Sequence, residues 1–219
     1  MTASPRIVLI HAVAVAMGPI AEAFARDWPA ARLVNLLEDS LSPDRARDAE
    51  LSPAMTARIL DLCRYARSTG ADAVLYTCSA FGPAIEAAAR ETSIPVLKPN
   101  EAMFEAALAH GARIGMLATF PPSVATMEAE FREEAARTRA DARLETILVE
   151  LALDALKAGD APAHNALVAA RAPELAASDA IVLAHFSTSR AAEAVRARVA
   201  RPVLTSPDAA VAKLKRLLA

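Results

Sequence analysis

Eight short apolar segments, each bounded by turn residues, recur along the chain. They span 6–11, 32–37, 72–77, 94–97, 113–118, about 144–150, 179–184 and 202–205. Stretches rich in Ala, Glu and Arg lie between most of them, for example at 53–68, 122–138 and 189–199. Pro53 and Pro122 stand where helices are expected to begin, since the missing N–H costs nothing there. This alternation predicts βαβ units and a parallel sheet.

The two halves of the sequence align without a gap when one is shifted by 107 positions. The aligned blocks are Arg6-Ile7 with Arg113-Ile114, Asp72-Ala73 with Asp179-Ala180, and Pro95-Val96-Leu97 with Pro202-Val203-Leu204. Because three separated blocks keep one register, we expect a duplicated α/β fold. The predicted fold is two similar, pseudo-symmetric, flavodoxin-like parallel-sheet domains with a cleft between them. Residues 1–98, with the C-terminal helix 206–219 packed back on them, form the first domain, and residues 99–205 form the second.

Composition and charge narrow the classes of function. Hydrophobic residues make up 54% of the chain and the formal net charge is -2, with Lys and Arg scattered, so no nucleic-acid partner is expected. The basic C-terminal stretch KLKRLLA fits the end of an amphipathic helix, where cations suit the helix dipole, better than a membrane anchor.

The apolar N-terminal stretch imitates a secretory signal. It is too short to span a bilayer, however, and a related strand recurs inside the chain at RIGMLATF, so we expect a buried strand. The spacing of the two cysteines, Cys63 and Cys78, matches neither a disulfide framework nor a zinc knuckle. We therefore expect a cytoplasmic protein with reduced thiols and no membrane partner. The sequence leaves open whether the chain forms a homo-oligomer.

The repeat aligns Cys78 in TCSAFG with His185 in VLAHFS, each just beyond the end of a strand. Open α/β sheets bind ligands at this edge, so we expect one titratable side chain on each face of the cleft. Cys78 precedes a helix that starts near Pro83, which favours a thiolate, and a protonated His185 would lower the thiol pKa further. The alternatives are a small buried hydrophobe for Cys78 and a hydrogen-bonded strand-end residue for His185. Cys63 has helical spacing from neighbouring apolar residues and is assigned to the core.

Hydroxyl residues gather near the same strand ends. Thr119 and Ser123 lie at the start of the helix after the fifth strand, a suitable place for a substrate carboxylate, although an ordinary N-cap explains Ser123 equally well. Ser79 and Ser187 flank the two titratable residues as further donors. His11 ends the first strand, where substrate binding and packing are equally good interpretations. The chain has no G-x-S-x-G, Walker loop, G-x-G-x-x-G or metal-ligand cluster, so neither a cofactor nor a metal is expected.

Together these features resemble the aspartate/glutamate racemase superfamily, which includes amino-acid racemases, hydantoin racemase, maleate isomerase and arylmalonate decarboxylase. The resemblance covers nearly the whole chain and rests on the duplicated halves and on TCSAFG, LATF and VLAHFS. It implies proton transfer at a carbon held between one cysteine of each half. Carried over, Cys78 matches the first cysteine, Thr119 the carboxylate-binding loop and His185 the place of the second cysteine, which this chain lacks.

The resemblance favours a cofactor-independent racemase, epimerase or isomerase acting at the carbon next to a carboxylate, with Cys78 and His185 on opposite faces of a small substrate. Decarboxylation of a malonate-like acid, which needs one proton donor, is an alternative. A carboxylate-binding protein without catalysis is another. Three phenylalanines in the expected cleft loops indicate either a partly apolar ligand or packing between the domains: Phe81, Phe120 and Phe186. The sequence does not predict which substrate is used.

Overall fold

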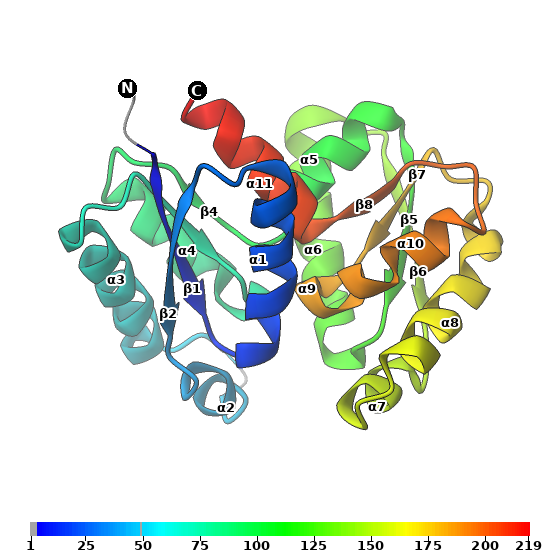
Figure 1. Ribbon diagram of the computed structural model, residues 1–219, viewed down its shortest axis with the longest axis horizontal. Helices are drawn as coiled ribbons and strands as arrows, with labels where there is room; N and C mark the ends of the chain where they lie inside the picture. The colour runs from blue at the N-terminus through cyan, green and yellow to red at the C-terminus, as the bar shows by residue number, and fades with distance from the viewer. Residues whose placement is uncertain (1–3, 49) are drawn as a thin grey trace. The chain divides into compact units, whose positions relative to one another are not determined.

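The strands form two four-stranded sheets in the computed structural model, which describes residues 4–48 and 50–219 (Figure 1). The strand orders are β2-β1-β3-β4 and β6-β5-β7-β8, and every pairing is parallel. Met1–Pro99 and Ala210–Ala219 make one structural unit, and Asn100–Ala209 make the other. The prediction of a duplicated α/β fold with parallel sheets is confirmed. The first three residues of the expected N-terminal segment lie outside the described residues.

The sheet of the first unit has helices on both faces. Its strands are β1 (Arg6–His11), β2 (Arg32–Leu37), β3 (Ala73–Tyr76) and β4 (Val96–Leu97). Its helices are η1 (Ala14–Ala16), α1 (Met17–Asp27), α2 (Leu41–Arg45), α3 (Pro53–Ser68), η2 (Ser79–Phe81), α4 (Gly82–Arg90) and most of α11 (Ser206–Leu217). Helices α3 and α4 pack on the face that carries Val8 and Ile10. Successive residues of a strand point to opposite faces, so His11 lies on the other face.

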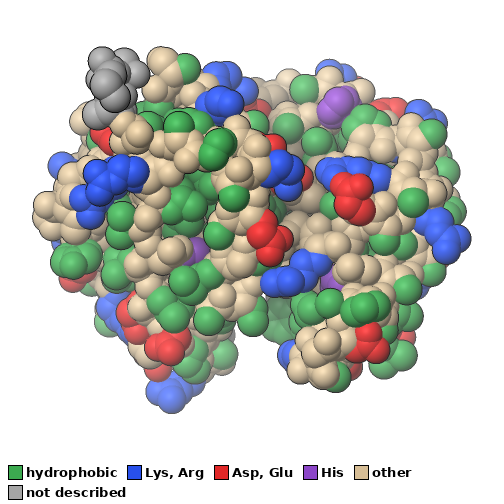
Figure 2. Space-filling view, viewed as in Figure 1, with side chains coloured by type: hydrophobic (Ala, Val, Ile, Leu, Met, Phe, Trp, Pro, Cys, Tyr) green, Lys and Arg blue, Asp and Glu red, His purple; other side chains and the backbone are tan. Residues whose placement is uncertain are grey.

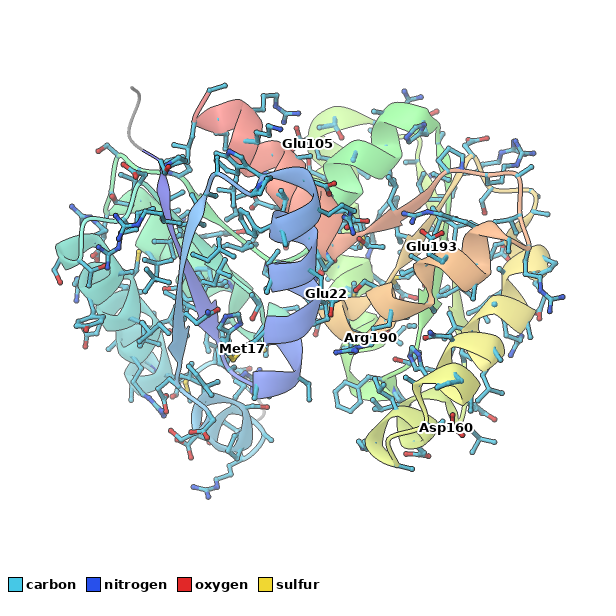
Figure 3. The ribbon with its side chains drawn as sticks, in the orientation of Figure 1. Met17, Glu22, Glu105, Asp160, Arg190 and Glu193 are labelled. Atoms are coloured by element: carbon cyan, nitrogen blue, oxygen red, sulfur yellow. The ribbon has the colours of Figure 1, made fainter. Side chains whose placement is uncertain are left out.

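The second unit repeats this plan. Its strands are β5 (Arg113–Ala118), β6 (Arg143–Leu148), β7 (Ala180–Leu183) and β8 (Val203–Thr205). Its helices are α5 (Glu101–His110), α6 (Pro121–Thr138), α7 (Ala152–Lys157), α8 (Ala161–Arg171), η3 (Ala172–Leu175), α9 (His185–Thr188), η4 (Ser189–Ala191) and α10 (Ala192–Arg196). Helices α5 and α6 cover one face of the sheet, and α8 and α10 cover the other. Asp160, labelled in Figure 3, caps α8 by accepting a hydrogen bond of 2.9 Å from the Ala163 N–H.

The repeated sequence blocks make the same backbone contacts in each unit. The Asp72 carboxylate accepts from the Arg6 N–H at 2.7 Å, and the Asp179 carboxylate accepts from the Arg113 N–H at 2.9 Å. The Val74 N–H donates to the Pro95 carbonyl at 2.9 Å, and the Ile181 N–H donates to the Pro202 carbonyl at 2.9 Å. The blocks are therefore the residues that align the middle strand of each sheet with its neighbours.

The helix expected over 189–199 is shorter and divided. The segment begins with the 3₁₀ turn η4 and continues as α10, which ends at Arg196. A tight 3₁₀ turn is common where a helix starts. None of the described helices is long and apolar enough to cross a membrane.

Candidate active site

Cys78 lies in an extended segment between β3 and the helical turn η2. Its backbone has φ -126° and ψ 126°, and it occupies the N-cap position of η2, after which α4 begins at Gly82. Cys78 and Ser79 are half-buried, whereas Phe81 is buried. The thiol therefore sits at the carboxyl end of a middle strand, the place where open parallel sheets bind ligands.

His11 is fully buried and uses both ring nitrogens within the protein. Its Nδ1 lies 2.9 Å from Thr77 Oγ1, and its Nε2 lies 3.0 Å from Asn35 Oδ1. Desolvation lowers the pKa of His11, and the hydrogen bond to Asn35 opposes part of that shift. With both nitrogens occupied, the ring has no free polar atom to offer a substrate in this arrangement.

Cys63, by contrast, belongs to the core of the first unit. It is 3% exposed on α3, and burial raises the pKa of its thiol. The buried thiol is thereby kept in its protonated, poorly nucleophilic form.

His185 begins α9 directly after β7, with a left-handed backbone conformation of φ 68°. Such a conformation is uncommon for a residue other than glycine. It costs roughly 1 kcal/mol or more, so it persists only where the surrounding structure holds it. Residues in this state cluster at functional sites. His185 thus combines an unusual backbone with the same strand-end position that Cys78 has in the first unit.

The Ser123 hydroxyl fixes the orientation of the His185 ring. Ser123 Oγ lies 2.7 Å from His185 Nε2, and it also donates to the Phe120 carbonyl at 2.7 Å. A hydroxyl has one hydrogen, so the Nε2 atom must carry the hydrogen of the Ser123–His185 bond. This leaves the lone pair of the imidazole on Nδ1. The Phe120 ring packs edge-on against the imidazole, with ring centres 6.4 Å apart.

Burial keeps the imidazole of His185 neutral. Desolvation lowers its pKa to about 4, far below the ordinary value for histidine. The expectation of a protonated His185 that depresses the thiol pKa of Cys78 is therefore wrong at neutral pH. A neutral imidazole with a free Nδ1 is instead suited to accept a proton.

The remaining hydroxyl residues fall into two groups. Thr119 is buried, and its hydroxyl pairs with the Thr188 hydroxyl at 3.1 Å, which joins the end of β5 to α9. Ser79 and Ser187 are half-buried, and among the described residues their hydroxyls have no hydrogen-bond partner. Ser79 and Ser187 are thus the hydroxyls available to a ligand.

The start of α6 offers fewer donors than the sequence indicates. Pro121 and Pro122 have no N–H, and the Ser123 N–H already donates to the Phe120 carbonyl at 3.2 Å. The interpretation of this helix start as the main carboxylate site is weakened accordingly. Ser123 acts here on the imidazole, a role that neither N-capping nor anion binding predicts.

The structure groups the expected residues within each unit. His11, Cys78 and Ser79 lie at or just beyond strand ends of the first unit. In the second unit Thr119 follows β5, Ser123 lies in the first turn of α6, and His185 and Ser187 lie in α9, which follows β7. Whether the two groups act on one substrate stays a prediction. Sequence reasoning missed Asn35 and Thr77, the partners of His11. Their only signals are a polar residue inside RLVNLL and a hydroxyl directly before Cys78.

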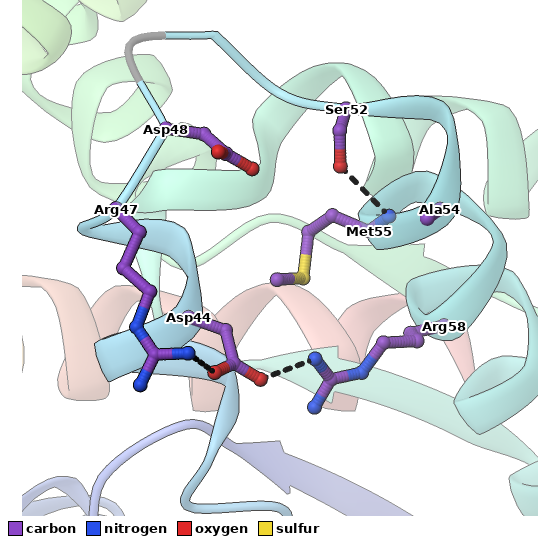
Figure 4. Close-up of a pocket in the computed structure, with 7 residues that line it drawn as sticks. All are labelled: Asp44, Arg47, Asp48, Ser52, Ala54, Met55 and Arg58. Atoms are coloured by element: carbon purple, nitrogen blue, oxygen red, sulfur yellow. Dashed lines mark hydrogen bonds and ion pairs between the residues drawn. The ribbon is translucent and has the colours of Figure 1, made fainter.

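A hollow of about 360 Å³ lies at α2 and α3 (Figure 4). None of the predicted site residues lines it. Its cationic side chains are already paired, because Asp44 bonds both Arg47 and Arg58. Figure 2 likewise shows acidic and basic side chains interspersed on the visible surface of each unit, without a single-sign patch. Among the described residues, no three His, Cys, Asp or Glu side chains gather as metal ligands.

Comparisons with known proteins agree with this arrangement. No curated protein sequence matches the chain. An allantoin racemase structure from Klebsiella pneumoniae is 21% identical, with TM-score 0.76 over 98% of this chain and 88% of that one. A glutamate racemase isoform from Bacillus anthracis is 13% identical, with TM-score 0.73 over 99% and 82%. A mutant of arylmalonate decarboxylase, in its sulfate-associated form, is 20% identical, with TM-score 0.67 over 97% and 93%.

These structural similarities show the fold, and the match to a family model shows the family. The model described as Asp/Glu/Hydantoin racemase matches residues 12–213, nearly the entire chain. The match includes both strand-end groups apart from His11. The chain therefore belongs to the Asp/Glu/Hydantoin racemase family.

Proposed function

We propose that this protein is a cofactor-independent racemase, epimerase or isomerase that moves a proton at the carbon next to a carboxylate. Cys78 and His185 are the proposed acid–base pair. The observation that carries the proposal is the neutral imidazole of His185, held by Ser123 at the strand end that corresponds to the position of Cys78.

In one direction His185 acts as the base. The C–H bond of the substrate breaks, its proton goes to Nδ1, and the electron pair stays on the carbon and spreads into the carboxylate. Ser123 supports this step because it keeps the hydrogen on Nε2 and so the lone pair on Nδ1. General-base catalysis of this kind typically contributes about 10² to 10⁴ in rate.

Cys78 completes the reaction from the other face of the carbon. Its S–H bond breaks, the proton goes to the carbon, and Cys78 is left as a thiolate while His185 is an imidazolium. Exchange with water then returns both groups to their resting states. The reverse direction starts from this thiolate and imidazolium form, before exchange with water: the Cys78 thiolate removes the proton and the imidazolium of His185 returns the one that it holds, so each residue serves one hand of the substrate.

We assign carboxylate binding chiefly to Ser79 and Ser187. Each lies next to or near a proposed acid–base residue, and each hydroxyl is free of partners among the described residues. Donors that meet the charge developing on the substrate in the transition state supply the largest share of such catalysis. The exposed Phe120 ring, edge-on to the imidazole, favours a substrate with an apolar part.

Decarboxylation of a malonate-like acid is the second candidate. It is favoured by one observation, the single thiol at the strand ends of a chain whose other cysteine is buried. That reaction needs only one proton donor, Cys78, and gives one hand of product. Release of carbon dioxide would distinguish decarboxylation from racemisation.

Both proposed reactions are tested by incubating the protein with amino acids, hydantoins and malonates in deuterated water and following the products by NMR. The proposal predicts deuterium at the carbon next to the carboxylate and formation of both hands. Deuterium in one hand with loss of carbon dioxide would establish decarboxylation. Ligand binding without any deuterium uptake would contradict both reactions and indicate a binding protein.

A further inference from the structure

We propose that His11 is a positioning residue for Cys78, acting through Thr77 and anchored by Asn35. The inference rests on the proposed function only in that Cys78 has a chemical role. It replaces direct substrate binding as the role of His11.

Three neighbouring strands contribute to one buried polar chain. Asn35 lies on β2, His11 ends β1, and Thr77 follows β3 directly. The bonds measure 3.0 Å from Asn35 to His11 and 2.9 Å from His11 to Thr77. His11 is fully buried and Thr77 is 6% exposed, so water does not compete readily for these bonds.

The chain has one consistent direction. Asn35 Oδ1 can only accept, so His11 Nε2 donates to it, and the lone pair on Nδ1 of the neutral ring accepts from Thr77. The Thr77 hydroxyl has one hydrogen and two acceptors within reach, His11 Nδ1 at 2.9 Å and the Ile10 carbonyl at 3.4 Å, and the shorter distance favours Nδ1. The Thr77 N–H also donates to the Ile10 carbonyl at 3.0 Å. Thr77 is therefore held by both its side chain and its backbone, directly before Cys78. Because the chain ends in a carboxamide, which does not relay protons near neutral pH, it positions the loop and is no proton wire.

The second unit serves as an internal comparison. Ala118 and Ala184 occupy the places of His11 and Thr77, and both are buried. Thr146 occupies the place of Asn35, since Leu9 pairs with Asn35 as Met116 pairs with Thr146. The buried Thr146 hydroxyl has no partner among the described residues. The second unit thus folds with alanine at the places of His11 and Thr77. The sheet itself therefore does not require a buried imidazole, which is costly to desolvate.

The test uses the full-length chain with His11→Ala, Thr77→Val and His11→Asn. The first readout is the pH midpoint for alkylation of Cys78 by iodoacetamide. We expect the Ala and Val variants to raise this midpoint by about half a pH unit, because the thiolate shifts relative to the helix start. We expect kcat for deuterium exchange to fall about tenfold with KM within about threefold, as for a small misplacement of a reacting group.

Two variants separate positioning from general stability. His11→Asn keeps an amide oxygen near the place of Nδ1, so we expect it to return the midpoint to within about 0.2 pH units of the parent protein and kcat to within about threefold. Ser52→Ala removes the N-cap bond of α3 to the Met55 N–H and serves as a destabilised control with an unchanged midpoint. A lowered melting temperature with unchanged alkylation and kcat in the Ala and Val variants would overturn the inference. Absence of exchange in the parent protein would overturn the proposed function alone, since the alkylation readout needs no turnover.

Discussion

Ser123 Oγ and His185 Nε2 lie 2.7 Å apart, and the same hydroxyl donates to the Phe120 carbonyl. This relationship fixes which nitrogen of a partly buried imidazole carries a hydrogen. In the proposed mechanism it assigns Ser123 to the orientation of the base, in place of the anion site that its position at a helix start indicates.

The first prediction concerns the protonation of His185. Because burial lowers its pKa to about 4, the imidazole should stay neutral down to about pH 5. Histidine titration followed by NMR, with His185→Gln used to assign the signal, measures this directly. A His185 pKa at or above 6 would contradict the proposed resting state.

The same shift affects stability. The unfolded chain binds protons at histidine near pH 6.5, whereas folded His185 does not until about pH 4, so the free energy of unfolding should fall as pH drops between these values. The lowered pKa of His11 acts in the same direction. Urea unfolding at several pH values tests this, and His185→Gln should flatten the dependence in this window. An equally steep dependence in the variant would show that other groups are responsible.

Ser123→Ala should disturb the tautomer of His185. Loss of the acceptor for Nε2–H should increase the form with hydrogen on Nδ1, lower the rate of exchange about tenfold, and cost about 1 kcal/mol of stability. Nitrogen-15 NMR of the imidazole reports the tautomer. Ser189→Ala is the matched control, because Ser189 also donates to a nearby carbonyl, that of Phe186, at 2.6 Å. Equal effects of the two variants would leave Ser123 without a special role.

The two thiols should differ in reactivity. Brief treatment with iodoacetamide near neutral pH should modify the half-buried Cys78 at least about tenfold faster than Cys63, whose thiol pKa is raised by burial. Mass spectrometry of the peptides measures the ratio, and labelling in denaturant, where both should react, is the control. Equal labelling of the native protein would contradict a reactive Cys78.

Gly111→Ala should destabilise the second unit. A Cβ atom at this position would clash with Asp179 Oδ2, the carboxylate oxygen that accepts from the Arg113 N–H. We expect a loss of about 1 to 3 kcal/mol in the free energy of unfolding. Asp179→Gly also removes the Asp179 Cβ, which a Cβ at position 111 would meet as closely as the carboxylate. In that background the same glycine change should cost less, and an equal cost in both backgrounds would show that the close approach is relieved in another way.

Much of the fold could be predicted from the sequence because the same blocks recur in both halves and make the same backbone contacts in each. Asp72 and Asp179 bind the N–H groups of Arg6 and Arg113, so the repeat marks strand alignment directly. The position of Cys78 and His185 at strand ends follows from the same register. The protonation state of His185 could not be predicted, since it depends on burial and on a bond to Ser123, which has Ala16 as its counterpart in the first half and so is not marked by the repeat. The His11–Asn35 contact likewise depends on the pairing of β1 with β2.

The most direct test of the central claim is the stereochemistry of exchange in Cys78→Ala and His185→Gln. On a substrate that the parent protein racemises, each variant should lose racemisation by about 10² or more. In deuterated water, Cys78→Ala should still exchange the hand that His185 deprotonates, without inversion, and His185→Gln should still exchange only the opposite hand. Racemisation of both hands at the parent rate in either variant would contradict the assignment of Cys78 and His185 as the acid–base pair.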